Sequence, residues 1–267
     1  RWRYLLYERL ALGWQGTDRQ KRVLAWGTTV VAIVIIPLAV SVHSVLAFLF
    51  GVTSRPGWDS TIFAPYFVLG AMFSGVATVI IAVAGFRWAY HLEQYITRKH
   101  FEYLGYIMMT LGAGYGYFMF SEYMTEGYKL HEGAREMMEL MIVGRLAPFM
   151  WLFGIGGLIV PVLLVALPVT RNIFGITVAA IAVLLAMWLK RFLIVVPGLA
   201  EPMMPTPLVI YWPSRVEIMI TLGAIAAIPL LMMLFFRLFP IISIFEIEEV
   251  AEEDAKRTAA ALHSAVQ

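Results

Sequence analysis

Long apolar segments separated by short polar connections run down almost the whole chain. Each apolar segment is about as long as a helix that crosses the hydrocarbon core of a bilayer, which needs roughly 20 residues. The pattern therefore predicts an all-α fold, a polytopic transmembrane helix bundle. The six predicted spans are residues 23–50, 64–90, 102–125, 144–168, 172–197 and 214–238.

The two ends of the chain differ from this region. Residues 1–22 are basic and aromatic, and Trp2, Tyr4 and Leu10 favour a helix that lies along the membrane interface. Residues 241–267 are acidic and then alanine-rich, which is typical of a solvated cytoplasmic tail. Since the sequence starts at an arginine, we expect it to be a piece of a longer protein in which 23–240 is the six-helix transmembrane region.

Composition supports the membrane prediction. Hydrophobic residues make up 61% and charged residues 14% of the chain, against about 45–50% and about 25% in ordinary globular domains. A formal net charge of +2 argues against a nucleic-acid partner. The absence of cysteine excludes thiolate zinc sites, cysteine-ligated iron–sulfur clusters and c-type haem attachment, so we expect any such metal on partner subunits.

The distribution of lysine and arginine predicts the orientation. With six crossings both termini lie on one side, and that side collects most of the basic residues of the connections. We therefore expect cytoplasmic termini, and expect the 51–63 turn, an acidic loop at 126–142 and the proline-rich 197–213 segment to face outward.

His43 and Asp59 flank the outward turn after the first predicted span. A neutral imidazole accepts a proton, and a nearby carboxylate stabilises the protonated form, which suits a site that takes protons from a reduced substrate. The alternative is an interfacial histidine bonded to backbone, with Asp59 capping the next helix. A haem bound by two histidines is disfavoured, because His91 and His100 lie a membrane thickness from His43.

Glu122 and Glu126 lie four residues apart, on one face near the outward end of the third predicted span. A buried Glu122 suits proton relay, with Arg145 as its counter-ion. A purely structural clamp between Glu122 and Arg145 is the alternative.

Lys190 and Arg191 lie about 18 residues into the fifth predicted span, and adjacent helical residues point about 100° apart. One is therefore expected to face the bundle, where an inward arginine would suit a quinone carbonyl. Snorkelling of both side chains to the interface explains the pair equally well. Glu217, early in the sixth span, is typical of a helix cap.

Aromatic residues, Trp58 and Tyr66 among them, gather at the same outward depth as these polar groups. An interfacial aromatic belt explains their number, but together with the polar residues they favour a pocket for a flat ring. Gly70 with Ser74, and Gly112 with Gly116, have the spacing that lets helices pack closely in lipid.

Six segments together resemble the NrfD-like, polysulfide-reductase membrane-subunit family, and look most like the quinol-oxidising C subunit of bacterial alternative complex III. They are YLLYERLALGWQGT, VSVHSVLAFLF, PGWDSTIFAPYFVLGAMFSG, YIMMTLGAGYGYFMFSEYM, MWLKRFLIVV and FRLFPIISIFEIEE. They occur in order, and the likeness covers the chain to about residue 249.

The resemblance implies a subunit of two four-helix bundles in the bacterial inner membrane that oxidises menaquinol or ubiquinol near the periplasmic face. Electrons would pass to an iron–sulfur subunit outside and on to c-type haem subunits, beside a second NrfD-like membrane subunit, with protons released outward. His43, Arg191 and Glu122 match the family pattern. Asp59 stands where the family usually has histidine, and Lys190 where it usually has an acidic residue.

These observations lead to one hypothesis about the site. His43 and Asp59 accept protons and bond the ring, Arg191 polarises a quinone oxygen, Trp58 and Tyr66 contact the ring, and Glu122 with Arg145 relays protons. The alternative function is an anchoring or proton-conducting subunit with no quinone site. A secondary transporter fits less well, because the polar groups gather at one interface rather than at mid-membrane.

Overall fold

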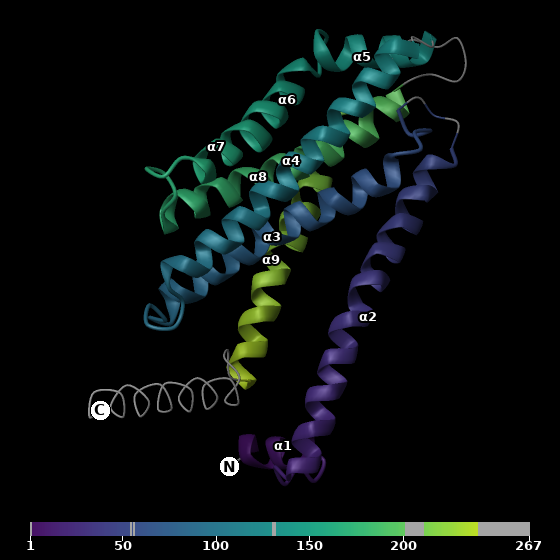
Figure 1. Cartoon of the computed structure of the whole chain (residues 1–267). Coiled ribbons are helices and arrows are strands. Elements are labelled where there is room, and N and C mark those ends of the chain that lie inside the picture. The colour runs from purple at the N-terminus through teal and green to yellow at the C-terminus, as the bar shows by residue number, and fades with distance from the viewer. Residues whose placement is uncertain (1, 54, 56, 130–131, 201–210, 240–267) are drawn as a thin grey trace, which may run out of the picture. The chain divides into compact units, whose positions relative to one another are not determined.

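A computed structural model gives the structure of the chain, and it describes residues 2–53, 55, 57–129, 132–200 and 211–239. All regular secondary structure in these residues is helical (Figure 1). The elements are α1 (Trp2–Leu10), α2 (Asp18–Gly51), α3 (Phe63–Ala89), α4 (Arg98–Lys129), α5 (Glu132–Ile142), α6 (Ala147–Trp151), the π-helical η1 (Leu152–Ile159), α7 (Val160–Ala166), α8 (Ile173–Ala200) and α9 (Arg215–Leu238).

The all-α, polytopic prediction is confirmed. Five helices are long and apolar enough to cross a membrane: α2, α3, the continuous Ala147–Ala166 helix, α8 and α9. The remaining predicted span, residues 102–125, corresponds to α4, which is long enough with 32 residues but carries many glycine, tyrosine and charged residues. Its composition therefore leaves α4 out of these five. The predicted tail at 241–267 and most of the 197–213 segment lie outside the described residues.

The chain divides into two compact units. The first joins Arg1–Val23 to Trp212–Gln267 and contains α1 and α9. The Tyr7 hydroxyl donates to the carbonyl of Leu238, which ties these two helices together. Helix α9 begins with a capping box, in which Ser214 and Glu217 bond each other's backbone N–H groups, as the cap prediction for Glu217 requires.

The second unit, Leu24–Tyr211, contains a four-helix bundle of α3, α4, the α6–η1–α7 helix and α8. Glycines let these helices approach closely, as small residues do in lipid. A Cβ at Gly70 would lie 2.8 Å from the Tyr115 ring, and one at Gly112 would lie 3.0 Å from Phe73. The small-residue prediction is thus confirmed for these two positions.

The π-helical turn η1 lies at the tightest contact of the bundle. A Cβ at Gly157 would lie 1.9 Å from the Cβ of Ala186 on α8, so only glycine fits there. Pro161, just beyond η1, has no N–H to complete a regular helical ladder. This arrangement places Phe153 in the core, fully buried against Tyr115.

One predicted loop is wrong. Residues 126–142, expected as an acidic loop, hold the last turn of α4 and the whole of α5. The exposed side of α5 carries Arg135 and Glu139, which form an i,i+4 ion pair. Its other side buries Met137 and Met141 against the bundle, so that α5 covers one end of it.

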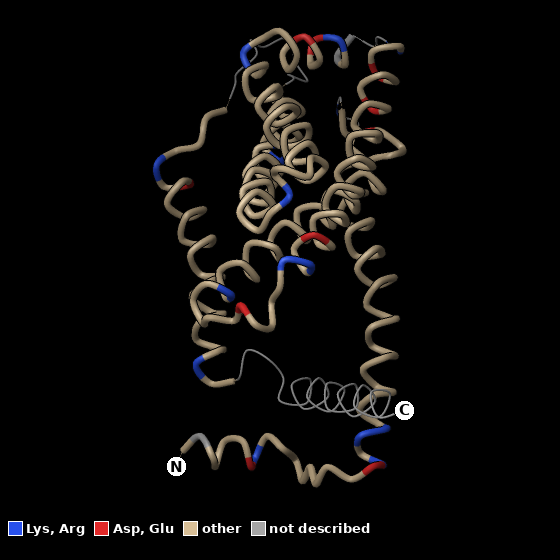
Figure 2. The backbone as a smooth tube through the Cα atoms, turned by 60° about the vertical axis from the view of Figure 1, so that its left-hand side comes forward, with Lys and Arg blue, Asp and Glu red and all other residues tan. Residues whose placement is uncertain are grey.

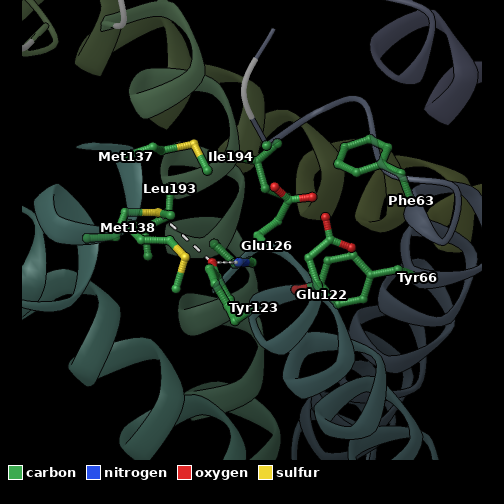
Figure 3. Close-up of a pocket in the computed structure, with 12 residues that line it drawn as sticks. Phe63, Tyr66, Glu122, Tyr123, Glu126, Met137, Met138, Leu193 and Ile194 are labelled. Carbon is green, nitrogen blue, oxygen red and sulfur yellow. Dashed lines mark hydrogen bonds between the residues drawn. The ribbon is translucent and has the colours of Figure 1, made fainter. Parts of the chain in front are cut away.

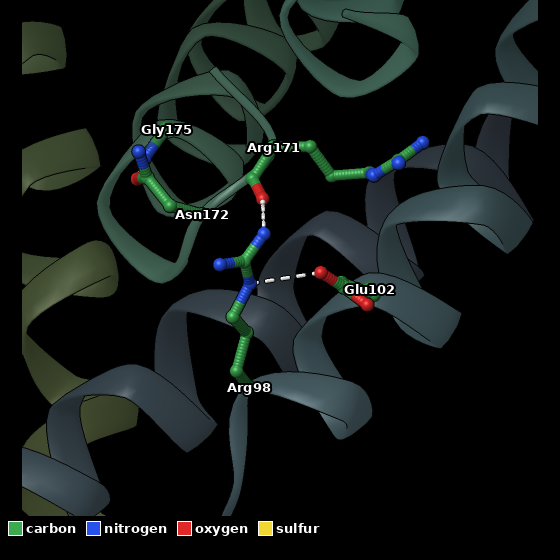
Figure 4. A network of polar contacts seen from close by, with 5 residues as sticks. All are labelled: Arg98, Glu102, Arg171, Asn172 and Gly175. Carbon is green, nitrogen blue, oxygen red and sulfur yellow. Dashed lines mark hydrogen bonds and ion pairs between the residues drawn. The ribbon is translucent and has the colours of Figure 1, made fainter. Parts of the chain in front are cut away.

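The start of α4, at the end of the helix far from α5, is held by a network of polar contacts that we call the polar clasp (Figure 4). Arg98 donates from Nε to Glu102 and from Nη2 to the carbonyl of Arg171, both at 2.8 Å. Next to Arg171, the Asn172 side chain accepts from the Gly175 N–H at 2.8 Å and caps α8. The clasp therefore fixes the start of α4 to the turn before α8.

Helix α2 meets the bundle through one end. Ala47 is its buried residue, and it packs with Phe63 and Ala64 of α3. No charge interrupts α2 between Arg22 and Gly51, and the same is true of α9 between Glu217 and Arg237, as the long tan stretches in Figure 2 show.

Candidate functional site

Trp58 fixes the turn between α2 and α3 to α8. Its indole is buried, and Nε1 donates to the carbonyl of Ile194 at 2.8 Å. The ring packs edge-on against Phe50 and lies so close to Gly198 that a Cβ there would come within 2.6 Å of Nε1. Trp58 lines neither of the cavities described below, so the structure gives it a docking role.

A cavity of about 160 Å³ lies beside this turn, between α2, α3, α4 and α8; we call it the His43 cavity. Its apolar lining comes from Leu46, Phe67, Gly70, Ala71, Met187 and Ile194. Its polar lining comes from His43, Tyr66, Tyr115, Lys190 and Arg191. Three of the predicted site residues, His43, Tyr66 and Arg191, therefore meet around one cavity.

The His43 ring is held in a defined tautomer. Nδ1 lies 2.8 Å from the carbonyl oxygen of Ala39, one turn earlier in α2. Because a carbonyl only accepts, Nδ1 carries a proton, and in the neutral ring Nε2 is then the nitrogen with the lone pair. The imidazole is thus set to accept a proton at Nε2.

Tyr66 supplies a hydrogen-bonding group with no assigned partner. Its side chain is 4% exposed, and its hydroxyl oxygen has no hydrogen-bond partner among the described residues. The ring stacks on Tyr115 with centroids 4.5 Å apart, which fixes its orientation. A buried hydroxyl without a partner is costly, so a bound polar molecule would stabilise it.

Lys190 and Arg191 point apart, as adjacent helical residues must, but the lysine is the one that faces the bundle. Lys190 is 3% exposed, whereas Arg191 is exposed at the mouth of the His43 cavity. The helical period shows this directly, since Lys190 shares a face with buried Met187 and Leu193. The sequence analysis considered an inward arginine, but the residue that faces the interior of the bundle is Lys190.

A second, smaller cavity of about 30 Å³ lies on the other side of Lys190; we call it the Glu126 cavity (Figure 3). That volume has room for one or two water molecules. Methionines of α5 cover it, and Tyr66, Lys190 and Ile194 line both cavities. Glu126 and Tyr123, which the sequence hypothesis left out, belong to its wall.

The two glutamates of this cavity are both 9% exposed. Glu122 accepts from the Ser60 hydroxyl at 2.9 Å. No hydrogen bond or ion pair is described for the Glu126 carboxylate within the part of the chain that the structure covers. Figure 3 shows the two carboxylates on the same side of α4, as their four-residue spacing predicts.

Two predicted residues lie apart from this arrangement. Asp59 is exposed and lines neither cavity, and it does not cap α3, whose N-cap is Ile62 without a side-chain bond. Arg145 is exposed, and no ion pair described for this chain joins it to Glu122 or Glu126. The buried cation beside the glutamates is Lys190.

The family model described as "Polysulphide reductase, NrfD" matches residues 2–202, which is most of the chain. The chain belongs to the NrfD family. The NrfD resemblance of the sequence is thus confirmed at the level of the family. Within the described residues, no group of three or more histidine, aspartate or glutamate side chains is arranged to hold a metal ion.

Two curated proteins are similar to this NrfD chain. The "Hdr-like menaquinol oxidoreductase integral membrane subunit" of Archaeoglobus fulgidus is 28% identical over 232 residues, which cover 80% of this chain and 58% of the relative. A putative dimethyl sulfoxide reductase membrane subunit of Halobacterium salinarum is 25% identical over 250 residues, covering 85% and 55%. The chain thus spans little more than half the length of either relative. Both relatives are membrane subunits of oxidoreductase complexes.

Proposed function

We propose that this chain is the quinol-oxidising membrane subunit of a respiratory or photosynthetic complex of the alternative complex III type, and that the His43 cavity binds the quinol ring. The observation that carries the proposal is the convergence of His43, Tyr66 and Arg191, from three different helices, on one largely apolar cavity. The menaquinol named in one relative supports menaquinol as the substrate, with ubiquinol as the other candidate.

The size and lining of the His43 cavity suit an aromatic ring. Cavities of about 150 Å³ with apolar walls bind benzene, and this one measures about 160 Å³. A further recess shares His43, Met187 and Arg191 with it and continues past Thr78 and Trp188, between α3 and α8. That recess gives the apolar tail of a quinol a path along the bundle.

The polar groups match the two-electron chemistry of a quinol. Oxidation to quinone removes two electrons and two protons. His43 Nε2 accepts one ring proton, because Nδ1 is already bonded to Ala39, and the second proton passes toward the carboxyl groups of the Glu126 cavity. The Tyr66 hydroxyl and the Arg191 guanidinium hold ring oxygens in place. The two electrons pass to an iron–sulfur cluster of a partner subunit on the periplasmic side, and from there to c-type haem subunits.

Release of the protons involves the Glu126 cavity in this proposal. Glu122 and Glu126 are buried beside a space large enough for water, which is the arrangement of a proton relay within a membrane. The route leads outward if the termini are cytoplasmic, as the basic residues predict. Asp59, at the exposed turn, and Arg145 remain candidates for the exit rather than for ring binding.

The test is quinol oxidation by the purified complex carrying Arg191→Gln or His43→Ala. Each variant is expected to lower kcat/KM by roughly 10²-fold or more, the usual size of a lost acid–base or charge-stabilising group. Arg135→Gln, at an exposed position on α5, is the matched control and should turn over like the wild type. If His43→Ala and Arg191→Gln both oxidise quinol at the wild-type rate, the site is elsewhere.

An anchoring or proton-conducting subunit without its own quinone is the second candidate, and the buried Glu122 and Glu126 favour it. It predicts that quinone is absent from the His43 cavity of the purified complex. It also predicts that Glu122→Gln impairs proton movement while quinol oxidation survives. Quinone content and proton release, measured on the same preparation, separate the two candidates.

A further inference from the structure

Lys190 is a charged side chain that the bundle buries almost completely. Glu122, Glu126 and Lys190 are the charged residues buried among those that the structure describes. A lysine with 3% exposure has not reached the interface by snorkelling, although α8 is close to its outward end there. Burial of an ammonium without compensation is costly, so its surroundings must favour the charge or the lysine must be neutral.

A hydroxyl group and aromatic rings surround the Lys190 amine. Nζ donates to the Tyr123 hydroxyl at 2.9 Å. The same nitrogen lies 5.1 Å from the centroid of the Tyr123 ring, 5.4 Å from that of Phe153 and 5.8 Å from that of Tyr66. Faces of aromatic rings at these distances attract a cation. Three rings from α3, α4 and η1 thus hold one charge in a fixed place.

Lys190 is also one of three residues shared by the two cavities. The carboxyl groups of Glu122 and Glu126 line the Glu126 cavity without forming an ion pair to Nζ. Tyr66, whose hydroxyl has no hydrogen-bond partner among the described residues, borders both cavities as well. The Lys190 side chain therefore lines the wall of the His43 cavity and borders whatever occupies it.

We propose that Lys190 supplies the positive charge that stabilises the anionic, singly deprotonated form of the ring bound in the His43 cavity. This inference rests on the proposed function. When a quinol gives its first proton to His43 Nε2, one negative charge remains on the ring until the first electron leaves for the iron–sulfur partner. The second electron follows, and the second proton leaves toward the carboxyl groups of the Glu126 cavity. A fixed cation in a site of low dielectric constant lowers the energy of the anionic state, and no reorganisation is needed at that moment.

The sign of the charge at position 190 decides which form of the ring is favoured. An acidic residue there would add a third carboxyl group beside Glu122 and Glu126 and would disfavour an anionic ring. A lysine does the opposite, which predicts that the cavity prefers anionic ring ligands.

The decisive experiment compares two ligands on the purified complex: an ionised hydroxynaphthoquinone, which carries the negative charge, and neutral menadione, which does not. The measured quantity is the ratio of their dissociation constants. Lys190→Met is expected to weaken binding of the anionic ligand about tenfold or more relative to menadione. Lys190→Arg keeps the charge and should preserve the ratio, and Lys99→Met, at an exposed position on α4, should leave it unchanged.

Turnover gives a second readout. With menadiol as electron donor and ferricyanide as acceptor, Lys190→Met should lower kcat on the order of 10²-fold with little change in KM, since the charge acts on a state formed after binding. Lys190→Arg, which cannot give up a proton, should recover most of that loss. Tyr123→Phe keeps the rings but removes the hydrogen bond to Nζ, and should have a smaller effect in the same direction.

The outcomes separate the two proposals. If Lys190→Met leaves the ligand ratio unchanged while His43→Ala abolishes turnover, the charge proposal is wrong and the quinol site stands. If Lys190→Arg binds both ligands normally but turns over as slowly as Lys190→Met, lysine carries a proton rather than a fixed charge, and the proposal is also wrong. If neither ligand binds to a folded wild-type complex, the proposed function itself fails.

Discussion

The two ends of helix α4 handle charge in opposite ways. At its start, Arg98 is exposed and forms an ion pair with Glu102 and a hydrogen bond to the turn before α8. Near its end, Glu122 and Glu126 are buried and face Lys190 across a small cavity. Surface ion pairs add little to stability, whereas buried charges are costly and are retained where they have a use. The contrast agrees with the proposal that the end of α4 near Glu126 is the functional one.

The largest expected effect comes from matched substitutions at the two ends of α4. Glu122→Gln should slow proton release coupled to quinol oxidation by about tenfold or more, because an amide cannot take up a proton there. Glu102→Gln removes a carboxylate from the same helix and should leave proton release unchanged. Proton release by the complex in liposomes, followed with a pH-sensitive dye, measures both. Equal effects of the two substitutions would contradict the comparison.

Trp58 allows an intermediate test. Trp58→Phe removes the hydrogen bond to the Ile194 carbonyl and leaves a void against Gly198, for a combined cost of roughly 1–3 kcal/mol. The turn should loosen beside the His43 cavity, so KM for quinol should rise severalfold with a smaller change in kcat. Trp88→Phe, at a position 81% exposed, is the control. An unchanged KM in a complex of reduced thermal stability would show that the turn stabilises the fold without shaping the site.

The smallest effect is expected at the polar clasp. Arg98→Gln removes one exposed ion pair and the bond to the Arg171 carbonyl, for about 0.5–1.5 kcal/mol of the free energy of unfolding. Quinol oxidation should be unchanged, because no residue of the clasp lines either cavity. Thermal unfolding and turnover of the same preparation measure the two effects. If Arg98→Gln lowers turnover by more than its loss of stability can explain, the start of α4 also has a role in function.

The helices were predictable because membrane spans impose a length and a composition on the sequence. The bounds of α3 and α8 differ from the predicted spans by no more than a few residues. The helix α5 was missed because its charged residues dominate the composition of the segment. Its buried side nevertheless follows a helical period through Ala134, Met137 and Met141.

The site was predictable only in part. His43, Tyr66 and Arg191 were identified as candidates one by one, and the structure brings them to one cavity. Asp59 was paired with His43 because the two lie close in the sequence, yet the turn between them directs Trp58 inward and leaves Asp59 exposed. Partners such as Lys190 and Tyr123, 67 positions apart, depend on how α4 and α8 pack, which the sequence of each helix does not specify.

A density map of the assembled complex with bound menaquinone is the most direct test of the proposed quinol site. We expect a ring in the His43 cavity, with one oxygen within hydrogen-bond distance of His43 Nε2 or the Tyr66 hydroxyl and with Lys190 Nζ beside the ring. A map that shows side chains filling this cavity and the quinone ring bound elsewhere would contradict the proposal.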